Sequence, residues 1–160
     1  MTIDRGDARR LADLLDLHDG RLGVPLLDDA GIRDLLASRP RIAMIGASAD
    51  PSRPSNGVLR DLVALGFDVV PVNPTVASVE GRRCHPNLAA AVEATGPVDL
   101  VDVFRRPEAC PGHAREAVAA GARCLWLQLG IASREAGEIA SAAGLAVVMD
   151  RCLAVEAVRA

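Results

Sequence analysis

The sequence contains no lysine and no tyrosine, and only 2% of its 160 residues are aromatic. All 18 of its basic side chains other than histidine are therefore arginines. Without lysine the chain cannot form a Schiff base or a P-loop, and without tyrosine as well it cannot build the proton-relay pair of many short-chain dehydrogenases. Few aromatic rings and a net charge of −3 also disfavour binding to nucleic acid.

Long apolar runs and paired cysteines are missing too. No stretch approaches the ~20 apolar residues that span a bilayer, and the charged start MTIDRGDARR does not resemble a signal peptide. The four cysteines, at positions 84, 110, 124 and 152, form no CxxC pair, which favours reduced thiols over disulfides or a zinc site. We therefore expect a cytoplasmic protein without a membrane partner.

The length suits one domain, and 50% hydrophobic residues are enough for a sizeable core. Leucines on one side of residues 2–20 predict a short helix ending at Gly20, which we assign to a peripheral or partly mobile N-terminal arm over residues 1–27. The remaining residues, 28–160, form the predicted domain. Asp28 or Asp29 can cap a second helix, which Pro40 stops and which we expect at the edge of the sheet.

The chain is organised around residues 41–56, RIAMIGASADPSRPSN. The apolar run at 42–45 is typical of a strand buried on both faces, and Gly46 then allows a tight bend. Small residues, Arg53 and a helix start capped by Ser55 or Asn56 would follow, with free backbone amides in the bend. This pattern describes a phosphate cradle, although an ordinary strand-to-helix turn has the same features.

Apolar segments at 67–72, 98–104, 123–129 and 145–149 alternate with helical patterns that end at glycines. Residues 75–86 show no periodicity and are predicted to be a loop. The alternation predicts an α/β domain of the Rossmann-like class, with a parallel five-stranded sheet covered by helices on both faces. Such sheets bind ligands at the carboxyl ends of their strands.

The sequence does not carry the fingerprint of a dinucleotide site. Only Gly46 of the GxGxxG pattern is present, and the second strand ends at Asn73-Pro74 without an acidic residue for the ribose hydroxyls. Arginines and uncharged polar groups at the strand ends suit a phosphate-rich anion instead. NAD is therefore the weaker candidate, although an NAD(P)-binding, oxidoreductase-like domain stays open as an alternative.

Six segments in order resemble one family: IAMIGAS (42–48), SRPS (52–55), VVPVNP (69–74), VDVFRRPE (101–108), LWLQLG (125–130) and VVMDRC (147–152). The chain is similar to the small stand-alone CoA-binding proteins, whose domain resembles the nucleotide-binding half of the succinyl-CoA synthetase α subunit. The resemblance covers roughly residues 28–152. It implies that coenzyme A or an acyl-CoA is the ligand.

By this resemblance, Gly46, Ala47 and Ser48 would hold the diphosphate together with Arg53 and Ser55. Asn73 and Pro74 would line the adenosine side, and Phe104 and Arg105 would flank the ligand. Gln128 would orient a bound group or satisfy a loop carbonyl, whereas Trp126, two residues earlier on the same strand, should pack in the core.

Several other residues have two interpretations. Arg82 and Arg83 are expected to be solvated, with contact to the 3′-phosphate of CoA as the alternative. Cys152 is either a buried inert thiol or a partner for the pantetheine thiol in a mixed disulfide. Asp102 is expected to bond loop amides near the site, and Asp99 to mark the start of a strand. His85, in a loop, and His113, on a helix, are assigned no catalytic partner.

We predict a binding protein for CoA or acyl-CoA that performs no chemistry of its own, because no nucleophile, base and oxyanion group converge in these motifs. One alternative is half of an acyl-CoA ligase that acts with a partner chain. It is disfavoured because the chain ends after its fifth strand, without a second domain for a phosphohistidine. Another is a redox-regulated module that senses CoA through Cys152. No metal site is expected, and a homodimer is expected only from the frequency of such assemblies.

Overall fold

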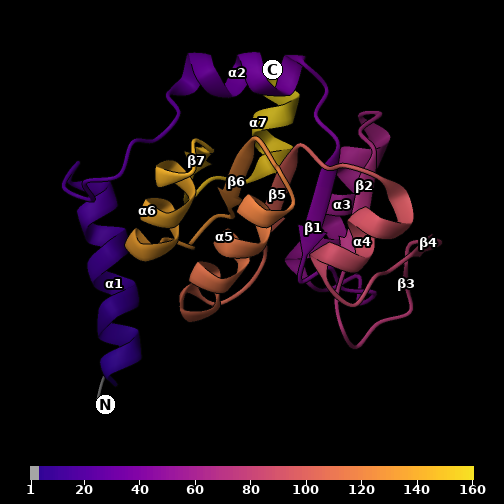
Figure 1. Ribbon diagram of the computed structural model, residues 1–160, viewed down its shortest axis with the longest axis horizontal. Helices are drawn as coiled ribbons and strands as arrows, with labels where there is room; N and C mark the ends of the chain where they lie inside the picture. The colour runs from indigo at the N-terminus through magenta and orange to yellow at the C-terminus, as the bar shows by residue number, and fades with distance from the viewer. Residues whose placement is uncertain (1–3) are drawn as a thin grey trace.

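A five-stranded parallel sheet forms the centre of the molecule in the computed structural model, which describes residues 4–160 (Figure 1). Its strands lie in the order β2-β1-β5-β6-β7. They are β1 (Ile42–Ile45), β2 (Val69–Val72), β5 (Leu100–Val103), β6 (Cys124–Leu127) and β7 (Ala146–Val148). The predicted parallel sheet of five strands is confirmed, with each strand after the first shorter than the apolar segment that predicted it.

Helices cover both faces of this sheet, as predicted. One face packs against α2 (Asp29–Ala37), α3 (Pro54–Ala64) and α7 (Leu153–Arg159), and the other against α4 (Leu88–Thr95), α5 (Cys110–Ala119) and α6 (Arg134–Ala142). A 3-10 turn, η1 (Pro107–Ala109), leads into α5. No helix among residues 4–160 is long and apolar enough to cross a membrane.

Successive strand residues divide between two cores. In β1, Ile42 and Met44 belong to the core under α2, α3 and α7, while Ala43 and Ile45 belong to the core under α4, α5 and α6. All four are essentially inaccessible to solvent. A strand that is buried on both sides needs apolar residues at every position, which explains why the sequence shows runs instead of alternation. Trp126 is fully buried and donates from Nε1 to the Arg151 carbonyl at 2.8 Å, as expected for a core residue.

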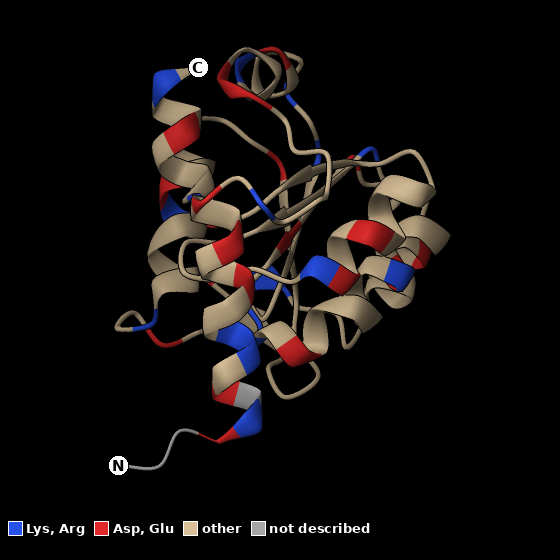
Figure 2. Cartoon of the chain, turned by 90° about the vertical axis from the view of Figure 1, so that its left-hand side faces the viewer, with Lys and Arg blue, Asp and Glu red and all other residues tan. Residues whose placement is uncertain are grey.

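The N-terminal helix α1 (Arg5–His18) is docked on the domain. Arg134 of α6 donates its amide to Asp13 at 2.9 Å and pairs through its guanidinium with Asp16 and the Leu22 carbonyl. His18 and Asp150 approach to 2.7 Å. Basic and acidic residues are interspersed along this helix (Figure 2). The helix is therefore peripheral but tied to the domain through Asp13, Asp16 and His18, and the boundary at residue 27 stays a prediction.

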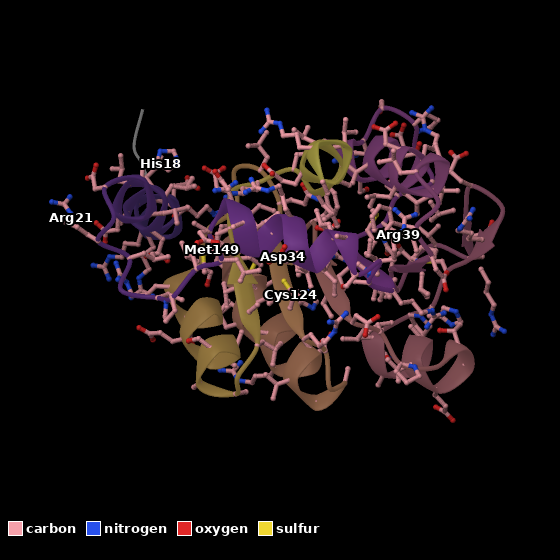
Figure 3. The ribbon with its side chains drawn as sticks, turned by 90° about the horizontal axis from the view of Figure 1, so that it is seen from above. His18, Arg21, Asp34, Arg39, Cys124 and Met149 are labelled. Carbon is pink, nitrogen blue, oxygen red and sulfur yellow. The ribbon has the colours of Figure 1, made fainter. Side chains whose placement is uncertain are left out.

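Helix α2 corrects one detail of the prediction. Asp28 caps it by accepting from the Gly31 amide at 2.8 Å, as expected. The helix crosses the amino-terminal end of the sheet beside α7, however, and does not pack along an edge strand (Figure 3). The edge strand β7 is instead bonded by the preceding segment, where the Leu27 amide donates to the Val147 carbonyl at 3.0 Å.

A small hairpin replaces the loop predicted at residues 75–86. Its strands, β3 (Ser78–Val79) and β4 (Arg82–Arg83), pair antiparallel around Glu80 and Gly81, both with positive φ. Strands of two residues are too short to give a periodic pattern. The sequence did mark the turn, because glycine in such a position favours a left-handed backbone.

Candidate functional site

A cavity of about 760 Å³ lies at the carboxyl ends of the strands. Ile45 is in register with Val72 on one side and Val103 on the other, and Val103 is in register with Leu127. The next residue of each strand therefore starts a loop at the same edge: Gly46, Asn73, Phe104 and Gln128. All four line the cavity, as do Ser48, Arg53, Ser55 and Arg105. The binding roles assigned to these eight residues stay predictions.

The bend at Gly46 depends on glycine for two reasons. Its φ is +82°, in the region that side chains with a Cβ disfavour, and a Cβ built there would lie 2.5 Å from the carbonyl oxygen of Phe104. The loops after β1 and β5 therefore approach each other more closely than any other residue would permit.

The predicted free amides are not found at the start of this bend. The amides of Gly46 and Ala47 both donate to the Val72 carbonyl, at 2.9 and 3.3 Å. Ala47 is fully buried and does not line the cavity. The part of the loop that does face the cavity begins at Ser48 and runs to the start of α3. Hydrogen bonds from Ser52 to Asp50 brace this part and lower the pKa of the Asp50 carboxyl.

The start of α3 differs from the prediction. Arg53 is the N-cap residue, no side chain caps the helix, and Pro54 occupies its first position. A proline there has no amide to satisfy and already holds the helical φ, so the helix begins before Ser55. Asn56, fully buried, instead donates from Nδ2 to the Ser48 carbonyl and to Glu80 Oε1, both at 3.0 Å. It thus joins the loop to the β3–β4 hairpin.

Asn73 and Pro74, which follow β2, line two different cavities. Asn73 lines the cavity, but its Nδ2 donates to the Ala47 carbonyl at 2.8 Å and its Oδ1 accepts from the amide and hydroxyl of Thr75. It holds two loops in place. Pro74 lines a different cavity of about 230 Å³ next to α4 and α5. The two residues predicted to act together on the adenosine therefore face different spaces.

Three arginines stand around the cavity without a hydrogen-bond acceptor among residues 4–160: Arg53, Arg105 and Arg106. The Nε of Arg105 is buried in this unbonded state. A buried unpaired donor costs free energy, and a partner from outside the chain would relieve that cost. Guanidinium groups donate best to carboxylates and phosphates, so the wall of the cavity is built to receive an anion.

Gln128 lines the cavity and is hydrogen-bonded to the buried side chain of Asp102. Its Nε2 donates to both carboxyl oxygens of Asp102, at 3.0 and 3.1 Å, which leaves its Oε1 for a ligand. Asp102 is fully buried in β5, and this desolvation raises the pKa of its carboxyl to about 8. The expectation that Asp102 bonds loop amides is wrong. It fixes the orientation of Gln128 and is largely neutral at pH 7.

A family model described as a CoA binding domain matches residues 40–157, and these residues include the sheet, the cavity and all the loops around it. The chain belongs to the CoA-binding domain family. The N-terminal helix α1 and helix α2 lie before the matched residues.

Relatives of this CoA-binding domain support the assignment. It is 36% identical to the uncharacterized protein YneT of Bacillus subtilis, over 79% of this chain and 91% of that protein. A hypothetical protein from Pyrococcus horikoshii OT3 superposes with a TM-score of 0.78 at 36% identity, over 83% of this chain and 92% of the other.

The fold also occurs within a larger enzyme. A dinucleotide-forming acetyl-coenzyme A synthetase of Ca. Korarchaeum cryptofilum superposes with a TM-score of 0.57 at 24% identity, over 69% of this chain and 26% of that one. At this identity the likeness concerns the fold alone.

Several cavity residues of the CoA-binding domain were not predicted. They are Val58, Thr75 and Val76. Five further lining residues, Pro54, Arg106, Pro107, Leu129 and Ile131, fall within the ranges 46–55, 104–107 and 128–131, which the ends of the predicted strands place at this edge. Thr75 and Val76 follow Asn73-Pro74 directly, so their closeness in sequence to predicted residues was a usable signal. Val58 lies one turn into α3, and its spacing from Pro54 places both on one side of that helix.

The cysteines differ in burial and therefore in the reactivity of their thiols. Cys152 is half-buried and lines the cavity, so the mixed-disulfide hypothesis keeps its geometric basis. Burial raises the pKa of the Cys110 and Cys124 thiols to about 12, which makes them unreactive.

The two histidines of the matched domain lie in different segments of the chain. His85 is buried beside β2, and His113 lies 3.3 Å from Glu116. Residues 4–160 contain no cluster of side chains that could hold a metal ion.

Proposed function

We propose that the protein binds coenzyme A or an acyl-CoA in the cavity at the carboxyl edge of its sheet. The observation that carries the proposal is the set of three arginines around this cavity, which lack an acceptor within the described chain. Gln128 Oε1 and the apolar side chains of Val58, Val76 and Ile131 add one acceptor and an apolar wall. A ligand with a diphosphate and a long, mostly apolar arm carrying amide donors matches this distribution.

The proposed role is binding without catalysis. Asp102, buried in β5, accepts from Gln128, and Cys152 lies in the wall of the cavity, where none of the lining residues is a carboxylate or a histidine. An acyl-CoA ligase acting through a partner chain is the alternative role. Co-purification of a ligase-like partner that gives ATP-dependent acyl-CoA synthesis would favour it over binding alone.

Calorimetric titration of the full chain with CoA, NAD and AMP tests the ligand. We expect CoA to bind more tightly than either of the others. Tighter binding of NAD, or no CoA binding at millimolar concentration, would reject the proposal.

The same titration tests the role of Arg53. If this side chain makes a charge-assisted bond to a phosphate, Arg53→Ala should weaken CoA binding by about 1.5 to 3 kcal/mol. Arg60→Ala, which alters an exposed arginine of the same helix outside the cavity, is the matched control and should leave the affinity unchanged. Equal effects of the two variants would remove Arg53 from the site.

We further propose a cytoplasmic location, which suits four cysteines that are all unpaired. A homodimer stays a prediction that sedimentation analysis can test.

A further inference from the structure

A second cavity, of about 660 Å³, adjoins the candidate site. It shares part of its wall with that site, namely Arg53, Phe104, Arg105 and Arg106. The rest of its wall is Asp4, Arg10, Glu108 and Ala109. Four arginines therefore face two carboxylates in a space that opens beside residues 46–55, the loop proposed to hold the diphosphate and called the phosphate loop below.

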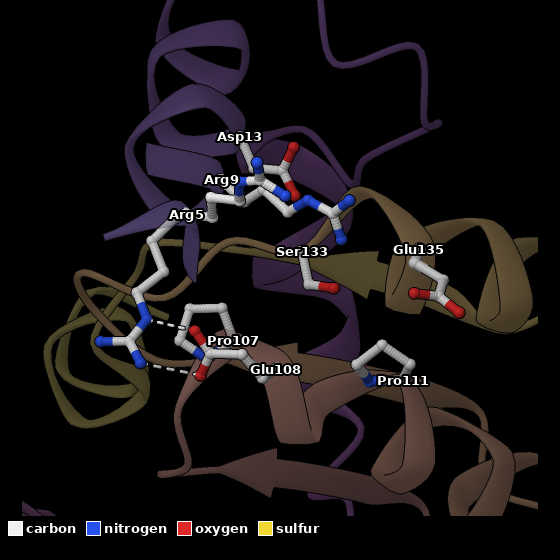
Figure 4. A pocket seen from close by; sticks show the side chains of 9 residues that line it. Arg5, Arg9, Asp13, Pro107, Glu108, Pro111, Ser133 and Glu135 are labelled. Carbon is white, nitrogen blue, oxygen red and sulfur yellow. Dashed lines mark hydrogen bonds and ion pairs between the residues drawn. The ribbon is translucent and has the colours of Figure 1, made fainter. Parts of the chain in front are cut away.

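Both carboxylates have partners within the protein. Glu108 is held by Arg10 of α1, which donates to it from Nε and, at 2.9 Å, from Nη2. Figure 4 shows this pair as dashed lines at Glu108. Asp4 accepts from the amide of Asp7 at 3.0 Å, at the start of α1. The pairing of Glu108 with Arg10 leaves Arg53, Arg105 and Arg106 as the cationic part of the wall.

Arg10 connects the N-terminal helix α1 to the matched domain. It lies on α1, outside the residues that the family model matches, and it reaches the start of η1 in the matched domain. The docking of α1 does not depend on it, because Arg134 holds Asp13 and Asp16 further along the helix. Removing the Arg10 side chain should therefore release Glu108 without releasing the helix.

A released Glu108 would change the cavity. Its carboxylate lies close enough to Arg106 for that charge to contribute to lowering the pKa of Glu108, after the larger effect of Arg10. Without Arg10, Glu108 would be free to pair with Arg106 and would repel an incoming anion. The Arg10–Glu108 pair thus controls the charge of the wall.

From this we infer that the second cavity binds a further anionic group of the ligand, separate from the group at the phosphate loop, and that Arg10 keeps the cavity cationic by holding Glu108. The inference rests on the proposed function. Two parts of the ligand can supply such a group: the 3′-phosphate of CoA, or a carboxylate at the end of an acyl chain.

A double-mutant cycle tests the role of Arg10. Calorimetric titration with CoA should show that Arg10→Ala weakens binding about two- to tenfold, that Glu108→Gln does not weaken it, and that the double variant binds like Glu108→Gln. Arg9→Ala removes the same charge from the same helix, outside this cavity, and should have no effect. A double variant as weak as Arg10→Ala, or equal effects of Arg9→Ala and Arg10→Ala, would overturn the inference. Thermal melts establish that each variant is folded.

Four ligands identify the anionic group. Arg106→Ala should weaken CoA about tenfold but dephospho-CoA less than twofold if the 3′-phosphate occupies the cavity. It should instead weaken succinyl-CoA about tenfold more than acetyl-CoA if the group is an acyl carboxylate. Equal losses for all four ligands would overturn this inference alone. Failure of the unaltered protein to bind any of them would overturn the proposed function as well.

Discussion

Arginines at the two ends of the sheet are in opposite states. At the amino end, Arg41 donates to Asp68 at 2.7 Å and to the carbonyls of Gly96 and Pro97 at 3.1 and 3.2 Å. Arg39, labelled in Figure 3, donates to the Leu65 carbonyl and lies 4.0 Å from the ring centre of Phe67. Both side chains join separate segments of the fold.

The carboxyl end contains arginines that the fold does not use. Arg53, Arg105 and Arg106 find no acceptor among residues 4–160, although a carboxyl group is buried below them in Asp102. Asp102 bonds the amide of Gln128 and is largely neutral at pH 7 because burial raises its pKa to about 8. The difference indicates that the positive charge of this end serves something outside the chain, since the Nε of Arg105 is buried without an acceptor, whereas Arg39 and Arg41 find acceptors within the chain.

The strongest way to break this arrangement is Gly46→Ala. A positive φ and a 2.5 Å approach to the Phe104 carbonyl predict a loss of about 2 to 4 kcal/mol in the free energy of unfolding and the loss of CoA binding. Gly121→Ala is the matched control at the amino end, because Gly121 has φ +72° but no atom within 4 Å of the position that a Cβ would take. It should cost only about 1 kcal/mol and keep binding. Denaturant titration and calorimetry measure both quantities, and equal costs would contradict the role of the close approach.

A crossed pair of variants tests the comparison directly. Arg105→Ala should weaken CoA binding by about 1.5 to 3 kcal/mol without lowering the melting temperature, since its guanidinium stabilises no other part of the chain. Arg41→Ala should lower the melting temperature by about 2 to 6 °C with unchanged affinity, since it loses three hydrogen bonds. Thermal melts measure the melting temperature of each variant, and calorimetric titrations measure its affinity for CoA. A melting temperature that falls equally in both would show that the two ends do not differ.

The buried carboxyl gives the smallest effect for a single unit of pH and sharpens the comparison further. Since the pKa of Asp102 is raised to about 8 in the folded protein, the folded state keeps a proton that the unfolded state loses near pH 4. Stability should therefore fall as the pH rises from about 4 to 8, by at most about 1.4 kcal/mol per pH unit from this group. Asp102→Asn should remove that slope, whereas Asp61→Asn, on the exposed side of α3, should retain it. Denaturation at pH 5, 6.5 and 8 measures the slopes, and parallel curves for the wild type and Asp102→Asn would refute the neutral state.

Most of the fold could be predicted from the sequence because strands and helix starts are marked by patterns of neighbouring residues. Apolar runs such as 42–45 and 98–104 predicted strands, and Asp28 marked a helix start where its side chain does accept an amide. The β3–β4 hairpin was missed because two-residue strands leave no pattern. The position of α2 was wrong because an amphipathic pattern shows which face is buried but not the element that buries it.

The site was only partly predictable for a related reason. Chain order and the parallel sheet place Gly46, Asn73, Phe104 and Gln128 at one edge, and this follows from the sequence. Which side of that edge a residue faces does not follow, so Pro74 and Ala47 were placed in the same site as their neighbours. The partners of Asp102 and Arg10 lie 26 and 98 positions away, and nothing in the local sequence indicates these pairings.

The contact between Gly46 and the Phe104 carbonyl also limits how this protein can change. The separation of the two central loops is set by main-chain atoms, so no substitution can widen the floor of the cavity without moving a strand. New ligand preferences can arise only from the side chains around the rim, such as those at 53, 106 and 128. The floor of the cavity is therefore constant, whereas the side chains at its rim can be replaced. Related sequences should differ in the ligand that they bind far more than in the position of the binding site.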